Sequence, residues 1–252
     1  MLILIILLLC FMIILFITLF SIKYERLSEY FGISDKKVTL IILNHLRPHN
    51  LELTLPILKS IKEIDQIIVT HGSPSGFKEF EGVENIKDYE NNEKYAAGRR
   101  FLIDINRINN ELIITMDDDH MLSTGFLRRI LEEAKKDPNQ IYGLHVRGCD
   151  ENGYDFSPPE DKQNTILTGM SITSKTVIKT FQQHFHEIEP ILLKYNGNGE
   201  DLAFNWIFRK YYKKNPKYIY GDFIELDGTN GYSSDSKHIE NRNSICKELS
   251  KL

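Results

Sequence analysis

Residues 112–120 read LIITMDDDH, an apolar run of strand length that ends in three adjacent aspartates, Asp117, Asp118 and Asp119. Carboxylates placed side by side at the end of a buried strand repel one another, because partial desolvation makes each negative charge harder to hold beside the next. A bound divalent cation relieves that repulsion, and oxygen ligands of this kind suit Mn²⁺ or Mg²⁺ together with substrate phosphates. The alternative is a solvated acidic turn. The strand-like residues directly upstream favour the cation site.

The N-terminal segment has a different character. Residues 1–22 contain no charged side chain. As a helix they would be about 33 Å long, enough to cross the hydrocarbon core of a bilayer. A cleavable signal peptide is the alternative, but the segment has no basic start and no small-residue cleavage site. We therefore expect an uncleaved transmembrane anchor over residues 1–22, a polar stem over residues 23–36 and one domain over residues 37–252.

Composition narrows the possible partners and cofactors. The net charge is -4 at pH 7 and both signs are interspersed, so there is no basic stripe for nucleic acid and we expect no nucleic-acid partner. The cysteines are Cys10, Cys149 and Cys246. At most one disulfide is possible after the anchor, so nothing in the sequence requires an oxidising compartment. The chain lacks a Walker-type phosphate loop, a nucleophilic-serine elbow and paired zinc-ligand motifs, which disfavours zinc.

The order of elements before the triplet indicates an α/β fold. Residues 38–43 and 66–70 are apolar runs typical of buried parallel strands, and we expect a helix between them that is capped at Thr54 with Pro56 in its first turn. Residues 92–108 are expected to form one helix. Strand, helix and strand with short connections indicate a right-handed parallel crossover. In open sheets of this type, ligands bind at the carboxyl ends of the strands, where the triplet is placed.

The chain after the triplet is more mixed. Its patterns predict helices over residues 124–137, 175–188 and 200–213, and strands over residues 140–146, 165–173 and 218–226.

Two basic groups are candidates for the site. Arg47 follows the first strand and can reach an anionic nucleotide, although an isolated arginine is more often a surface residue with a solvated head. Arg99 and Arg100 precede the triplet on a predicted helix, where a basic pair usually forms a solvated face. Taken alone, each signal is weak.

Two later segments carry further candidates. Residues 196–201 read NGNGED, which places Glu200 and Asp201 in the first turn of a helix, where the helix dipole favours carboxylates. Helix capping and catalysis are equally compatible with that spacing. Asn205 lies one turn after Asp201, so the two could share a polar face that points into a cleft. His238 and Arg242 would form a cationic face suited to a diphosphate if their segment is helical, and a frayed tail is the alternative.

Taken in order, these segments resemble the exostosin-like glycosyltransferases, glycosyltransferase family 64, which have the GT-A nucleotide-sugar fold. The resemblance runs from Val38 to Leu249 and implies a single GT-A (Rossmann-like) domain. Each piece is weak by itself, but the ordered set is specific. The pieces are ILNHLR (42–47), GRRF (98–101), the triplet as the family's form of the DXD motif, Arg147, LTG (167–169), EDLAFN (200–205), DG (227–228), and His238 followed by Arg242.

The resemblance implies transfer of a sugar, with an N-acetylhexosamine expected, from a UDP-sugar to a glycan or glycoprotein with retention of configuration. It assigns Mn²⁺ (or Mg²⁺) to Asp119 and Asp117. The catalytic residues would be Asp201, Glu200 and Arg242, and the nucleotide-binding residues Arg47, His71, Asn92, Arg100, Asp117 and Asp118. An inverting transferase with Asp201 as general base, an inactive nucleotide-sugar-binding scaffold and, third, a metal-dependent phosphohydrolase stay open as alternatives.

The chain departs from the family pattern in three places. Gly199 stands where the family motif has a cysteine, so we expect Cys246 to lack the disulfide partner found there. The asparagine expected at the end of the second strand is replaced around His71, and the region of Arg242 aligns only after a gap. Family members of this type work in the Golgi or endoplasmic reticulum lumen on a type II anchor. The lost disulfide, and basic residues Lys23 and Arg26 after the apolar segment, favour the cytoplasmic side instead, so the side of the membrane stays open.

Overall fold

The computed structural model describes residues 37–229, 231 and 236–252. Lys37–Leu252 form one compact unit. The expected anchor over residues 1–22 and the stem over residues 23–36 lie outside the described residues. Among the described residues, no helix has the length and apolar character needed to cross a membrane.

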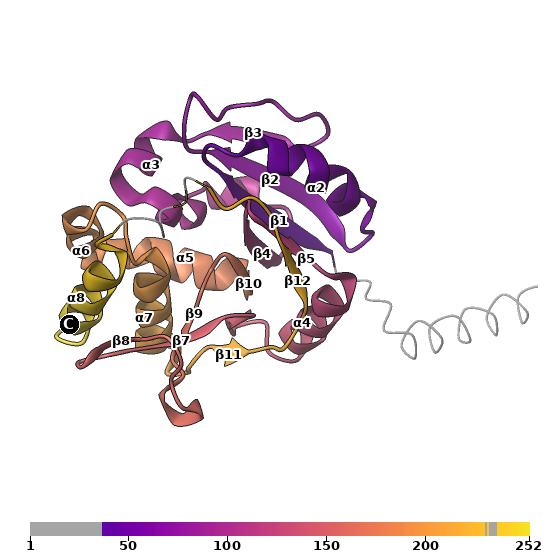
Figure 1. The fold of residues 1–252 in the computed structure, drawn as a ribbon. Coiled ribbons are helices and arrows are strands. Elements are labelled where there is room, and N and C mark those ends of the chain that lie inside the picture. The colour runs from indigo at the N-terminus through magenta and orange to yellow at the C-terminus, as the bar shows by residue number, and fades with distance from the viewer. Residues whose placement is uncertain (1–36, 230, 232–235) are drawn as a thin grey trace, which may run out of the picture. The chain divides into compact units, whose positions relative to one another are not determined.

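A seven-stranded sheet in the order β11-β6-β10-β4-β1-β2-β3 runs through the domain (Figure 1). β1 (Val38–Asn44) lies between β2 (Ile64–His71) and β4 (Leu112–Asp117) and is parallel to both. β10 (Met170–Ser174) pairs antiparallel with β4 and with β6 (Tyr142–Gly143). At the edges, β3 (Glu84–Lys87) is parallel to β2, and β11 (Lys217–Tyr218) is parallel to β6. The expected α/β class with a largely parallel central sheet is confirmed.

Helices cover both faces of this sheet (Figure 1). All of β1 is buried, and its side chains alternate between two cores because successive residues of a strand point to opposite faces. Leu40 and Ile42 pack with α2 (Pro48–Ser60) and α4 (Thr124–Lys136). Ile41 belongs to the other core, with α5 (Lys175–Gln183), α7 (Glu200–Tyr212) and α8 (His238–Leu249). Burial on both faces explains why the first strand reads as a continuous apolar run.

Short elements complete the domain. α3 (Tyr89–Tyr95) is followed by 3₁₀ turns at Ala96–Phe101 and Ile105–Arg107, and α6 (Glu189–Lys194) precedes α7. β5 (His120–Leu122) pairs with β12 (Phe223–Glu225). β7 (Val146–Asp150) pairs with β8 (Gly153–Asp155) on one side and β9 (Thr165–Ile166) on the other.

Several expected boundaries are wrong. α2 begins at Pro48 and not after Thr54, because the fixed φ of proline suits the first turn of a helix. Thr54 lies inside the helix, where its hydroxyl donates to the Asn50 carbonyl (3.1 Å). The helix expected over residues 92–108 breaks at Ala96, whose φ of 47° ends α3. The expected strands over residues 140–146 and 165–173 are each split in two. The helices expected from about residues 124 and 200 are confirmed.

Candidate active site

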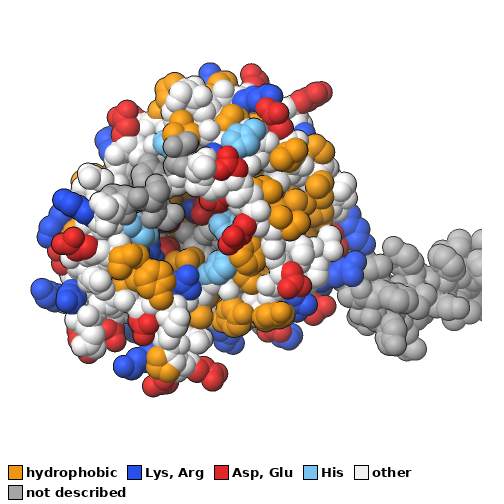
Figure 2. Space-filling view, viewed as in Figure 1, with side chains coloured by type: hydrophobic (Ala, Val, Ile, Leu, Met, Phe, Trp, Pro, Cys, Tyr) orange, Lys and Arg blue, Asp and Glu red, His pale blue; other side chains and the backbone are white. Residues whose placement is uncertain are grey.

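The carboxyl ends of β1 and β4 open into a cavity of about 330 Å³. Its walls come from several separate parts of the chain: the residues after β1, the 3₁₀ turn that follows α3, the aspartate triplet after β4, the loop before β10, the turn before α7 with the first residues of that helix, Gly231, and α8. Figure 2 shows a hollow near the centre of the molecule, with acidic side chains inside it and histidines at its rim. The triplet and Asp201 therefore line the same cavity. This agrees with the prediction that ligands bind at the carboxyl ends of the strands, where the triplet lies.

The three aspartates of the triplet lie in different environments. Asp118 is 2% exposed, forms an ion pair with Arg47 and accepts a hydrogen bond from the His45 amide (3.2 Å). Burial raises the pKa of Asp118 to about 6 even though Arg47 opposes that shift. Asp119 is half-buried and accepts from Arg47 (2.8 Å) and from His120 (2.7 Å). Although its burial acts in the opposite direction, these two partners lower the pKa of Asp119. Asp119 therefore carries its negative charge at the cavity surface.

The outer two aspartates and the following histidine form a set that fits a cation. Asp117, Asp119 and His120 each offer one ligand atom, and these atoms lie within 4.8 Å of one another. Two carboxylates suit a hard divalent ion such as Mn²⁺ or Mg²⁺. His120 was not among the expected metal ligands, Asp117 and Asp119. Its position directly after the triplet is the sequence feature that could have indicated it. Asp118 lines the cavity but faces Arg47.

The basic pair on the predicted helix face is fully buried, so the expected solvated face is wrong. Arg99 and Arg100 are each 1% exposed. Arg100 donates to the Thr168 carbonyl (2.6 Å) and to Asp117 (2.5 Å), which joins β4 to the loop before β10. Arg99 donates to the carbonyl oxygens of Asn44 (3.0 Å) and Thr70 at the ends of β1 and β2. The break at Ala96 turns this short segment into the domain and so buries both guanidinium groups.

His71 and Asn92, expected to contact the nucleotide, lie behind the cavity wall and bond to protein groups. The His71 ring is paired with Asn44 (2.9 Å) and with Asn85 (3.1 Å). The Asn92 side-chain oxygen accepts from Arg99 (2.5 Å). In this structure both residues brace the ends of β1 and β2.

The start of α7 presents two acidic side chains in different settings. Asp201 is 3% exposed; one oxygen accepts from Arg242 (2.6 Å) and the other from the Leu202 amide (2.9 Å). Glu200 is half-buried and accepts from the Thr168 hydroxyl (3.4 Å). Burial, reinforced by the negative charge of Asp201, raises the pKa of Glu200 to about 7. Glu200 can therefore hold or release a proton near neutral pH.

Asn205 does not share the cavity with Asp201 as expected. It is fully buried, and its side-chain amide both accepts from the Ile166 amide (3.1 Å) and donates to the Ile166 carbonyl (2.9 Å). It thus satisfies the edge of β9 and fixes α7 on that strand. Arg147 also lies outside the set of residues that line the cavity, beside Tyr154 (3.2 Å) and the Phe156 ring.

The C-terminal candidates form a helix, so the frayed-tail alternative is wrong for residues 238–249. His238 and Arg242 both line the cavity. The family's partner for Cys246 is absent, as expected from Gly199, but the one disulfide that the sequence allowed after the anchor is formed, between Cys246 and Cys149. Gly199 has a φ of 81°, and a side chain there would meet Ile245 at 2.7 Å, which explains why a cysteine does not fit at that position.

Comparisons with known proteins place this geometry in context. The family model described as glycosyl transferase family 64 domain matches residues 38–252. No curated protein sequence matches this chain. A CMP:2-keto-3-deoxy-manno-octonic acid synthetase complexed with CTP has a similar fold, with a TM-score of 0.51 and 11% identity over 76% of this chain and 94% of that one. The 2-C-methyl-D-erythritol 4-phosphate cytidylyltransferase of Francisella tularensis gives a TM-score of 0.49 and 13% identity over the same shares.

Proposed function

The chain belongs to glycosyltransferase family 64 and is a glycosyltransferase, and from this premise we propose that it transfers an N-acetylhexosamine from a UDP-sugar to a glycan or glycoprotein with retention of configuration. The single observation that carries the proposal is the shared cavity. It brings the aspartate triplet, which suits a metal-bound diphosphate, together with the buried Asp201–Arg242 pair from the far end of the sequence. A GT-A domain of the exostosin-like type is the architecture we infer for it.

Donor binding is assigned to the strand-end side of the cavity. Asp117, Asp119 and His120 would hold Mn²⁺ or Mg²⁺, which when bound would neutralise charge on the diphosphate as UDP departs. Arg47 and Arg100 supply guanidinium groups beside the same carboxylates. Their planar donor pattern suits phosphate oxygens. Arg47 lines the cavity, so the donor diphosphate is expected beside it, while Arg100 acts from behind the wall by holding Asp117.

The α7 side of the cavity is assigned to the sugar and the acceptor. Both Asp201 oxygens already accept hydrogen bonds, one from Arg242 and one from a backbone amide. This engagement favours a positioning and charge-stabilising role over general-base catalysis, and so favours retention over the inverting alternative. Glu200, with a pKa near 7, can exchange a proton with a bound hydroxyl group at neutral pH. Arg242 holds Asp201 in place from α8.

The membrane anchor over residues 1–22 and the stem over residues 23–36 remain part of the proposal. The Cys149–Cys246 disulfide supports the lumenal side, since cytosolic thiols are kept reduced. It removes one of the two hints toward the cytoplasm that the sequence offers. The basic residues after the apolar segment are the remaining opposing hint.

A donor screen tests the function directly. The full chain in detergent is incubated with a panel of UDP-sugars and Mn²⁺ while UDP release is measured, and the anomeric configuration of any transferred sugar is read by NMR. Parallel calorimetry with UDP and Mn²⁺ measures donor binding. Retained configuration supports the proposal, and inverted configuration assigns the alternative. Binding without UDP release from any sugar indicates a scaffold, and release of free phosphate indicates a phosphohydrolase.

A further inference from the structure

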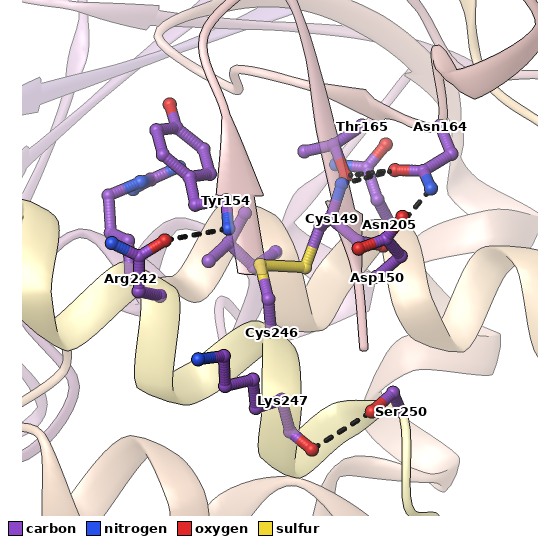
Figure 3. Close-up of a disulfide and its surroundings, with 12 residues drawn as sticks. Cys149, Asp150, Tyr154, Asn164, Thr165, Asn205, Arg242, Cys246, Lys247 and Ser250 are labelled. Carbon is purple, nitrogen blue, oxygen red and sulfur yellow. Dashed lines mark hydrogen bonds between the residues drawn. A yellow bond between two sulfur atoms is a disulfide. The ribbon is translucent and has the colours of Figure 1, made fainter. Parts of the chain in front are cut away.

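The disulfide lies on the same helix as the catalytic arginine candidate. It joins Cys149 in β7 to Cys246 in α8 across 97 residues of sequence. Arg242 precedes Cys246 by four residues, which places both on one face of α8. Figure 3 shows the bond between the strand and the helix, with Tyr154 and Arg242 to one side of it. Among the described residues, this disulfide is the only covalent cross-link to α8, and it lies one helical turn from Arg242.

The β7–β8 hairpin contacts α8 at two points one turn apart. Cys149 and Tyr154 are directly opposite each other in this hairpin. Cys149 bonds to Cys246, while the Tyr154 ring lies 4.4 Å from the Arg242 guanidinium carbon. The Tyr154 amide also donates to the Asn243 side chain (2.9 Å). The covalent contact therefore fixes the register in which the hairpin presents Tyr154 to Arg242.

α8 packs Ile245 and Leu249 into the core with α5 and α7, but its polar ties to its surroundings are weaker than the disulfide. Lys194 and Tyr195 both bond to Glu248, but the Lys194 pair is exposed, and exposed pairs contribute little to stability. The Arg242–Asp201 pair depends on close placement because both side chains are 5% exposed. If α8 shifts, Asp201 is left as a buried charge without its cation.

We propose that the Cys149–Cys246 disulfide positions Arg242 against Asp201, so that its reduction frees α8 and switches sugar transfer off. The proposal rests on the function assigned to Arg242 above. A pocket of about 400 Å³ is lined by both cysteines, Trp206 and Arg209, and gives a dithiol a route to the bond. One thiolate of the dithiol attacks a cysteine sulfur to form a mixed disulfide. Its second thiol then closes a disulfide in the reductant, which loses two electrons, and leaves both cysteines as thiols.

The first test compares the oxidised and dithiothreitol-reduced full chain. The readouts are UDP release from the UDP-sugar selected in the donor screen, calorimetric binding of UDP with Mn²⁺, and amide hydrogen exchange. We expect reduction to lower kcat by about 10- to 100-fold, the range expected when a reacting group is displaced by about 1 Å. UDP binding stays within about twofold, because its groups lie on β1 and β4. Exchange should increase in α8 and remain slow in β1 and β4.

Variants separate positioning from general stability. Cys149→Ala/Cys246→Ala should match the reduced chain and lose its response to dithiothreitol. Glu248→Gln is the matched control, since it weakens one polar tie of α8, to Lys194 and Tyr195, and should leave kcat and the dithiothreitol response unchanged. Full kcat in the reduced chain overturns the proposal. Loss of UDP binding together with kcat also overturns it, because the bond would then maintain the whole fold.

A separate variant distinguishes failure of the role assigned to Arg242 from failure of the disulfide proposal. Arg242→Lys in the oxidised chain tests the arginine without touching the disulfide. If this variant keeps full UDP release, the role assigned to Arg242 is wrong whatever reduction does. If it loses UDP release while the reduced wild-type chain remains active, the arginine matters and the disulfide does not position it.

Discussion

Replacement of Glu200 by glutamine should stabilise the protein above neutral pH. The carboxyl group has a pKa of about 7 in the folded chain against an ordinary value of 4.5. Between these two pH values the folded state keeps a proton that the unfolded chain has released, so wild-type stability falls as pH rises from 4.5 and the loss is complete above 7. The difference of about 2.5 pKa units corresponds to about 3 kcal/mol at about 1.4 kcal/mol per unit. Glutamine cannot ionise and escapes this penalty.

The measurement is urea unfolding of wild type and Glu200→Gln at pH 5 and pH 8. We expect the variant to be more stable by less than about 1 kcal/mol at pH 5 and by about 3 kcal/mol at pH 8. Glu248→Gln is the control with the opposite sign, because Lys194 and Tyr195 lower the pKa of Glu248. Its carboxylate contributes stability above about pH 4.5 that the variant loses. If Glu200→Gln has the same pH dependence of unfolding as wild type, the raised pKa and the burial that causes it are wrong.

Three further substitutions test other parts of the site. Gly169→Ala should weaken Mn²⁺-dependent UDP binding, measured by calorimetry, by about tenfold or more. The reason is that the new methyl group would lie 2.4 Å from a carboxylate oxygen of Asp117. Gly228→Ala is the control and should bind UDP normally, because the atom nearest to its new methyl group is 3.7 Å away. Asp119→Ala should abolish that binding with an unchanged circular dichroism spectrum, and unchanged affinity would remove the metal assignment. Cys149→Ser/Cys246→Ser should lower the free energy of unfolding by about 2–5 kcal/mol in urea, and equal midpoints for wild type with and without reductant would contradict this.

Sequence patterns were sufficient where one local signal determined the outcome. The apolar run of residues 38–43 gave a buried parallel strand, and the aspartates after β4 fell at the cavity because a strand's carboxyl end is fixed by the strand itself. The glycine-rich turn before Glu200 likewise began a helix where predicted. In each case the chemistry and the element lie within a few residues of each other.

Tertiary placement was beyond the same patterns. Arg99 and Arg100 read as a solvated helix face, but a single residue with positive φ, Ala96, turns them into the core. Asn205 shares a helix face with Asp201 by spacing, yet β9 takes up its hydrogen bonds. Burial of a polar side chain depends on which distant backbone groups need a partner, and a sequence window does not contain them.

The disulfide shows the same limit in another form. The family pattern pointed to a cysteine next to Glu200, and its replacement by Gly199 removed that partner for Cys246 without indicating whether Cys149 takes its place. The structure pairs Cys246 with a strand residue 97 positions earlier. The glycine is compatible with this because Ile245 occupies the space that a side chain at residue 199 would need.

The pairing of charges in the cavity bears on how a donor would enter it. Arg47, which lines the cavity, already bridges Asp118 and Asp119, and Arg100 holds Asp117 from behind the cavity wall. Arg99, which also lines the cavity, donates to backbone carbonyl oxygens and to Asn92. An unpaired buried charge costs several kcal/mol. A buried arginine or aspartate can therefore exchange one charged partner for another more easily than it can lose its partner. On the proposed function, a diphosphate offers acceptors to the arginines while a divalent cation offers charge to the aspartates. Each alone would leave one set of side chains uncompensated, and this is a physical reason for nucleotide and metal to bind together.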